Sequence, residues 1–162
     1  MVGLIEMLRS LIFACITILL SSCTVKNDRK DRVNFEELSK ELFSAYGYTY
    51  KLNFRKEILD ESNVYIDKNH LSKRDFTDVV EKKLLEKGWK KIPALFDDQY
   101  MYCYDRKNAM SIVYPTQINY RNKNGNSMSV GEGNLDKWVI FYGYDMYGTT
   151  NCKNYFKNGR NL

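Results

Sequence analysis

His70 is the only histidine among the 162 residues, so it is the only imidazole that could act as a general base or bind a metal. Zinc sites built on two histidines and iron sites of two histidines and one carboxylate are therefore excluded. His70 lies in a polar segment before a predicted helix, and Ser72 is better placed to cap that helix than to act as a nucleophile. The Gly-x-Ser-x-Gly sequence of serine hydrolases does not occur. We interpret His70 as a loop histidine.

Carboxylates are the other groups that could catalyse a reaction. Asp97 and Asp98 are adjacent and could supply half of the carboxylate pair that hydrolyses glycosidic bonds. Adjacent acids before a predicted strand are also typical of a turn, and we favour that interpretation. We therefore expect no catalytic residue, no metal site and no cofactor. A small envelope hydrolase that uses carboxylates is the alternative.

The N-terminal segment has the order of a secretory signal. Arg9 is followed by a weakly polar to apolar run over residues 11–20, and two small serines then lead into Cys23. A helix of this length would cover only about half of the hydrocarbon core of a bilayer. We therefore expect residues 1–22 to be a signal peptide that is removed after export.

The sequence Leu20-Ser21-Ser22-Cys23 resembles the lipobox of bacterial lipoproteins. The resemblance covers only the signal segment. It implies that Cys23 becomes the first residue of the mature chain and carries acyl chains, palmitate among them, that anchor it in a membrane. Thr24 follows the cysteine, which in enterobacterial sorting implies the outer membrane and a domain that faces the periplasm. The alternatives are the inner membrane, or an ordinary secretory signal with an incidental cysteine.

The formal charge of +5 is not spread evenly over the chain. Residues 34–148 contain 17 basic and 17 acidic residues, so the predicted body is neutral. The excess lies in residues 23–33, which we interpret as the lipidated cysteine and a polar tether, and in the tail from Thr149. Nucleic-acid-binding domains carry excess positive charge on their folded face. We therefore expect no nucleic-acid partner, and a single domain over residues 34–162 with a basic C-terminal tail.

Two cysteines remain if Cys15 is removed with the signal and Cys23 is acylated. Cys103 lies in a predicted hairpin and Cys152 lies in the tail. In an oxidising compartment we expect these two residues to form a disulfide, which would attach the basic tail to the sheet. The alternative is two separate buried thiols.

The body shows the patterns of an α+β fold. Apolar residues at helical spacing, with capping residues at the ends, predict helices over residues 35–46 and from Ser72 to Gly88. The predicted strands are residues 48–54, 63–67, 100–104, 109–114 and 138–142. The Asn124-Gly125 pair predicts the turn of a further small hairpin. We expect two helices packed on one face of an antiparallel sheet of about four to six strands.

A row of tyrosines is the first candidate for a binding surface. Tyr100, Tyr102 and Tyr104 project from one face of their strand, opposite Met101 and Cys103. If the disulfide lies on the core face, the tyrosines form an exposed row that suits recognition of a protein or a glycan. If helices cover the row instead, only hydroxyls at its rim reach solvent.

The asparagine-rich loop that contains Asn124 and Asn126 is the second candidate surface. A small domain with a lipid anchor and no catalytic constellation suits a binding protein. We therefore expect a non-catalytic module of the cell envelope that binds another macromolecule, with a protein as its partner. An immunity or inhibitor protein against an envelope-acting toxin is one form of this role. The alternatives are the carboxylate hydrolase and a structural or assembly lipoprotein.

Overall fold

The structure is a computed structural model that describes residues 29–157, so the predicted signal peptide and the acylation of Cys23 lie outside the described residues. The helices are α2 (Phe35–Phe43), α3 (Lys73–Asp75), α4 (Lys82–Glu86) and α5 (Thr150–Lys157). A π-helical turn over Phe76–Glu81 joins α3 to α4. The strands are β1 (Tyr48–Arg55), β2 (Leu59–Asp67), β3 (Lys90–Ile92), β4 (Gln99–Cys103), β5 (Asn108–Val113), β6 (Asn119–Arg121), β7 (Ser127–Ser129) and β8 (Lys137–Asp145).

Capping side chains fix where the first two helical segments begin. The side chain of Asn34 accepts a hydrogen bond from the backbone N–H of Glu37 at 3.2 Å, which starts α2. Ser72 does the same for the N–H of Asp75 at 3.0 Å, which starts α3. The segment ends at Gly88, whose φ of 88° lies in the left-handed region that glycine adopts without strain. Both predicted helices are therefore confirmed, except that Ser44–Tyr46 at the end of the first one form a 3-10 turn.

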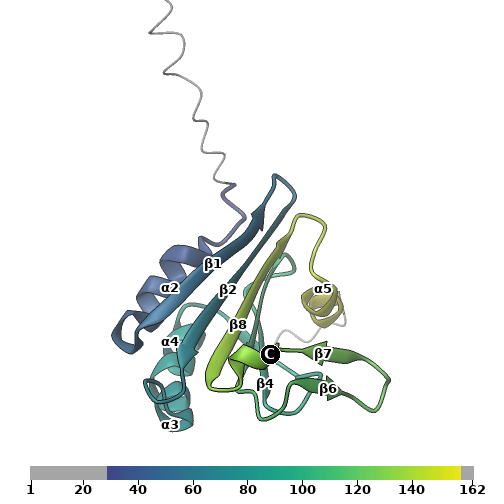
Figure 1. The fold of residues 1–162 in the computed structure, drawn as a ribbon. Coiled ribbons are helices and arrows are strands. Elements are labelled where there is room, and N and C mark those ends of the chain that lie inside the picture. The colour runs from purple at the N-terminus through teal and green to yellow at the C-terminus, as the bar shows by residue number, and fades with distance from the viewer. Residues whose placement is uncertain (1–28, 158–162) are drawn as a thin grey trace, which may run out of the picture.

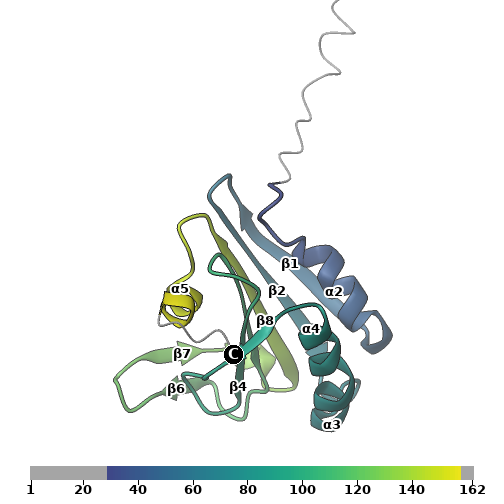
Figure 2. The same cartoon turned by 180° about the vertical axis from the view of Figure 1, so that it is seen from behind.

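Six strands form one antiparallel sheet in the order β1-β2-β8-β5-β4-β3. β6 and β7 form a separate hairpin that turns at Asn124-Gly125, as predicted. Figures 1 and 2 show α2, α3 and α4 on one side of the sheet, and α5 with the β6–β7 hairpin on the other. We call these two sides the α2 face and the α5 face. The predicted α+β class, with two helical segments on one face of an antiparallel sheet, is confirmed.

The main core lies between the α2 face of the sheet and the helices that cover it. Its largest buried side chain is Trp138 of β8, whose indole N–H donates to the backbone carbonyl of Leu71 at 2.7 Å. Phe76 packs on this indole with a ring-centroid distance of 4.8 Å. Because a buried indole N–H needs a partner, this hydrogen bond fixes the segment before α3 against the sheet.

The α5 face has a smaller core under α5, the helix that the C-terminal tail forms. Cys103 and Cys152 are joined by a disulfide with a Cα–Cα distance of 5.6 Å, so the predicted bond is present. Tyr155 and Phe156 of α5 pack on the apolar side chains around the disulfide. The sequence predicts the attachment of the tail, but neither its helical structure nor strand β3. Within residues 29–157, no helix is both long enough and apolar enough to span a bilayer.

Candidate binding cleft

Residues 29–33, which we call the N-terminal strap, are bound to the domain. The backbone N–H of Val33 donates to the side-chain oxygen of Asn108 at 3.0 Å, and the amide nitrogen of Asn108 donates to the carbonyl of Asp31 at 2.9 Å. Asn108 is fully buried. The interpretation of residues 23–33 as a tether is therefore wrong for the strap, because a buried amide far away in the sequence satisfies its backbone groups.

Ion pairs also hold the strap on the domain. The ammonium of Lys107 contacts the carboxylate of Asp31 at 2.6 Å and lowers the pKa of this carboxyl below its usual value. The guanidinium of Arg32 lies 3.7 Å from the buried carboxylate of Asp60 on β2. A charged pair in which one member is fully buried is less screened by solvent than a pair on the surface. Asp31 and Arg32 thus attach the strap to the domain through ion pairs.

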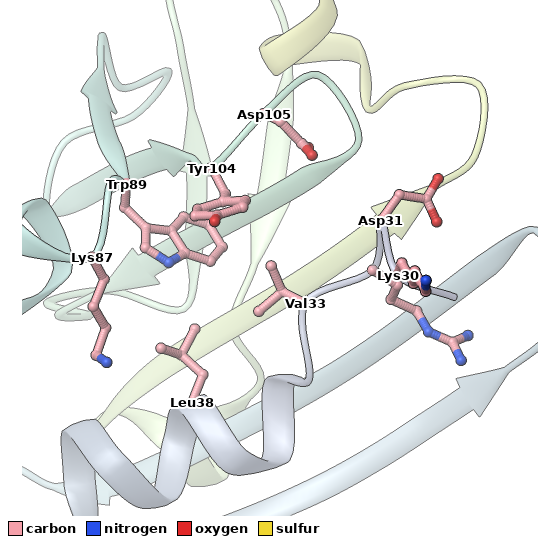
Figure 3. Close-up of a pocket in the computed structure, with 9 residues that line it drawn as sticks. Lys30, Asp31, Val33, Leu38, Lys87, Trp89, Tyr104 and Asp105 are labelled. Carbon is pink, nitrogen blue, oxygen red and sulfur yellow. The ribbon is translucent and has the colours of Figure 1, made fainter. Parts of the chain in front are cut away.

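The strap, α2 and the residues around β4 enclose a cleft of about 430 Å³ (Figure 3). Its walls are apolar in the middle. The rings of Trp89 and Tyr104 lie with their centroids 5.6 Å apart, and Val33 and Leu38 point toward them from the strap and from α2. Trp89 is buried, whereas 45% of Tyr104 is exposed. The ring of Tyr104 is thus accessible to solvent within the cleft.

The charged residues of the cleft lie at its ends. Lys87 lies at one end, and Lys30, Asp31 and Asp105 lie toward the other (Figure 3). The carboxylate of Asp105 accepts hydrogen bonds from the backbone N–H groups of Lys107 and Asn108, both at 2.7 Å. Lys30 makes no ion pair with any residue of the described part of the chain.

The predicted tyrosine row is wrong for Tyr102. This residue is fully buried, and its hydroxyl donates to the carboxylate of Glu81 at 2.7 Å. Burial and the neighbouring carboxylate raise the pKa of Tyr102 well above its ordinary value. The helices cover the row on the α2 face while α5 covers the opposite face, so both faces of β4 are buried.

The other two tyrosines differ in exposure. Tyr100 is half-buried and packs against Phe76 with a centroid distance of 5.0 Å. Tyr104 follows the last residue of β4 and opens into the cleft. Of the three predicted tyrosines, only Tyr104 belongs to the candidate site.

The other predicted surface lies away from the cleft. Asn124 and Asn126 are exposed at the tip of the β6–β7 hairpin, and their backbone N–H groups donate to the side-chain oxygen of Asn122 at 3.0 Å. Figures 1 and 2 show this hairpin on the other side of the sheet from α2. The structure therefore does not bring the two predicted surfaces together.

The residues considered for catalysis do not converge. His70 is exposed in a turn, and its imidazole lies close to Gly47. Asp97 and Asp98 lie in a turn as interpreted, and the carboxylate of Asp98 accepts a hydrogen bond from the hydroxyl of Thr116 at 2.6 Å. Within residues 29–157, no three His, Cys, Asp or Glu side chains are grouped so that they could hold a metal ion.

The sequence pattern does not single out Trp89 or the cations around it as parts of a site. The signal that could have identified Trp89 is its position directly after Gly88, because a tryptophan that follows a helix C-cap lies where the chain turns back toward the sheet.

No family model, no curated protein and no solved structure matches the chain.

Proposed function

We propose that the chain is a non-catalytic binding protein of the bacterial cell envelope, which acylated Cys23 attaches to a membrane and which binds a protein partner through the cleft. The lipobox-like sequence supports the proposed location in the cell envelope. In its most specific form, the proposal places the anchor in the outer membrane and the domain on the periplasmic side. The neutral charge of residues 34–148 agrees with a protein partner better than with a nucleic acid.

The observation that carries the proposal is the exposed ring of Tyr104 in the apolar wall of the cleft. Protein interfaces depend on a few aromatic or aliphatic side chains that enter pockets, surrounded by polar groups that exclude water. Trp89 and Tyr104 face Val33 and Leu38 across a space that can take one large apolar side chain. Tyrosine contributes large contact area at a low cost in conformational entropy.

The ends of the cleft add a preference in charge. Lys30 has no ion-pair partner among the described residues, so it can pair with a carboxylate of the partner at no cost to the fold. Lys87 already contacts Glu41, and the carboxylates of Asp31 and Asp105 are hydrogen-bonded. We therefore expect the partner to present an apolar side chain next to an acidic one. An immunity or inhibitor protein that binds an envelope-acting toxin would act in this way.

Site-specific photocrosslinking in living cells tests the proposal. A benzophenone amino acid replaces Tyr104 in one variant and Tyr147 in another. Tyr147 is the matched control because it is 70% exposed and does not line the cleft. We expect a discrete protein adduct from position 104 only, and its loss when Lys30→Glu is added. Equal adducts from both positions, or none from position 104, would contradict the proposal.

A further inference from the structure

A second hollow, of about 470 Å³, lies on the α5 face of the sheet and has a different chemistry from the cleft. The strand register explains its floor. Glu61 of β2, Gly143 of β8 and Ala109 of β5 are neighbours in one row across the sheet. Gly143 has no side chain, and a Cβ atom placed there would meet no heavy atom within 4 Å. Because no side chain projects from Gly143, the surface of the sheet is lower at this row than on either side of it. The low row lies between strands β1 and β2 on one side and the start of α5 on the other.

The lining of this groove combines polar side chains with apolar ones, among them Met101 and Phe141, and it carries no cation. Its amide groups come from Asn53, Asn63 and Asn151, and a hydroxyl comes from Ser111. The side chains of Asn53 and Asn151 make no hydrogen bond with any residue of the described part of the chain. Amides that line a hollow without an internal partner are available to a ligand.

Thr149, directly before α5, gives a second and independent sign of a missing partner. Its hydroxyl is shielded from solvent and has no hydrogen-bond partner among the described residues, although it lines the groove. A buried hydroxyl without a partner is destabilising. A ligand could satisfy this hydroxyl only after the atoms that shield it from solvent move aside.

The donor and acceptor set decides between classes of ligand. Anions are disfavoured, because the only charged side chain in the lining is the carboxylate of Glu61. Purely apolar ligands would leave the amides without partners. Sugar hydroxyls both donate and accept, so they match amides, hydroxyls and a carboxylate together. Phe141, which is partly buried against the cluster of Val113, Tyr120 and Val130, also lines the groove, and an aromatic ring can pack on the C–H side of a pyranose.

We propose that this groove binds a neutral oligosaccharide. Gly143 lets the sugar chain approach the backbone of β8, as a glycine inside a strand does where a ligand comes close. Asn53 and Asn151 bind hydroxyls from opposite sides of the floor. The site lies on the other face of the sheet from the cleft, so it goes beyond the proposed protein binding and is independent of it.

The Gly143→Leu variant of the full chain tests this site. A Cβ atom at position 143 meets no heavy atom within 4 Å, and the backbone there is not in the left-handed region, so we expect this variant to fold. Gly133→Leu is the matched control, because a Cβ atom at this position also meets nothing within 4 Å and Gly133 does not line the groove. Circular dichroism and the Tm of both variants check the fold.

Calorimetric titration with N-acetylchitotriose, cellotriose and maltotriose at up to about 10 mM gives the readout. We expect at least one sugar to bind the natural chain and the Gly133→Leu variant, and to bind the Gly143→Leu variant about tenfold more weakly or not at all. Asn151→Ala removes one amide and adds no bulk, and we expect this variant to bind the same sugar more weakly than the natural chain does. The proposal is overturned if none of the three sugars binds, or if the leucine at position 143 leaves the affinity unchanged.

Discussion

The side-chain oxygen of Asn108 accepts a hydrogen bond from the backbone N–H of Val33 at 3.0 Å, across 75 positions of sequence. The same side chain donates to the carbonyl of Asp31 at 2.9 Å, so one buried amide satisfies both a donor and an acceptor of the strap. The strap forms one wall of the cleft. Asn108 therefore helps to hold this wall of the cleft in place, together with the ion pairs of the strap.

The first prediction concerns this attachment. Asn108→Ala leaves two backbone groups of the strap without partners, and we expect the free energy of unfolding to fall by about 2–3 kcal/mol. Urea denaturation measures the loss, and hydrogen exchange at the amide of Val33 is expected to accelerate. Asn69→Ala is the control, because Asn69 is exposed in a turn, and we expect a change within about 0.5 kcal/mol. Unchanged exchange at Val33 would show that the strap is held by other contacts.

The second prediction concerns alkaline pH. Burial raises the pKa of both Tyr102 and Tyr142 above the ordinary tyrosine value. Their stabilising effect is complete below pH about 10, where the tyrosines of the unfolded chain are also protonated. Above that pH the unfolded chain ionises and the folded chain does not. We expect the free energy of unfolding to fall by about 1.4 kcal/mol per pH unit for each of the two residues until the folded protein ionises.

Urea denaturation between about pH 8 and pH 12 measures this slope. Tyr142→Phe is expected to remove the contribution of one residue. Absorbance at 295 nm follows ionisation in the folded protein, where Tyr102 and Tyr142 are expected to titrate only on unfolding. Ionisation of all thirteen tyrosines near pH 10 in the folded protein would show that the buried pair is solvated.

The third prediction concerns the disulfide between Cys103 and Cys152, which are 49 positions apart. Closing a loop of that length restricts the unfolded chain by about 4 kcal/mol in the entropy model. We expect reduction, or the double change Cys103→Ser and Cys152→Ser, to lower the free energy of unfolding by about 3–4 kcal/mol and to release α5. Denaturation with and without reductant measures the difference. The double variant is its own control, because reductant should not change its stability.

The fourth prediction concerns the anchor. Cys23→Ala removes the thiol to which the resemblance assigns the acyl chains, so we expect no acyl label and release of the protein from the membrane fraction. Cys15→Ala is the control, because Cys15 lies in the predicted signal peptide, and we expect full labelling in this variant. Membrane retention of the Cys23→Ala variant would contradict acylation at this residue.

The sequence predicts the elements whose signals are local. Asn34 and Ser72 cap helices within three residues of their partners, and Asn124-Gly125 turns a two-stranded hairpin. Such patterns depend on neighbouring residues alone, so one chain is enough to recognise them. The disulfide also follows from the sequence, because the expected compartment leaves two cysteines with no other role.

Burial of β4 could not be predicted, because it depends on elements far away in the sequence. Alternation shows that Tyr102 and Cys103 point to opposite faces, but it does not show which face is covered. Here both faces are covered. α5 covers one of them through Tyr155 and Phe156, but it forms from a tail whose mostly polar composition does not predict a packed helix. The strap was misread for the same reason, because its hydrogen bonds depend on Asn108.

The attached strap also shortens the linker between the proposed membrane anchor and the folded domain. If Cys23 carries the acyl chains, only residues 24–28 separate it from Arg29, whatever conformation those residues adopt. A fully extended chain of this length spans about 20 Å. The strap, which forms one wall of the cleft, would therefore stay within about 20 Å of the bilayer surface. A partner would have to come to the membrane to be bound.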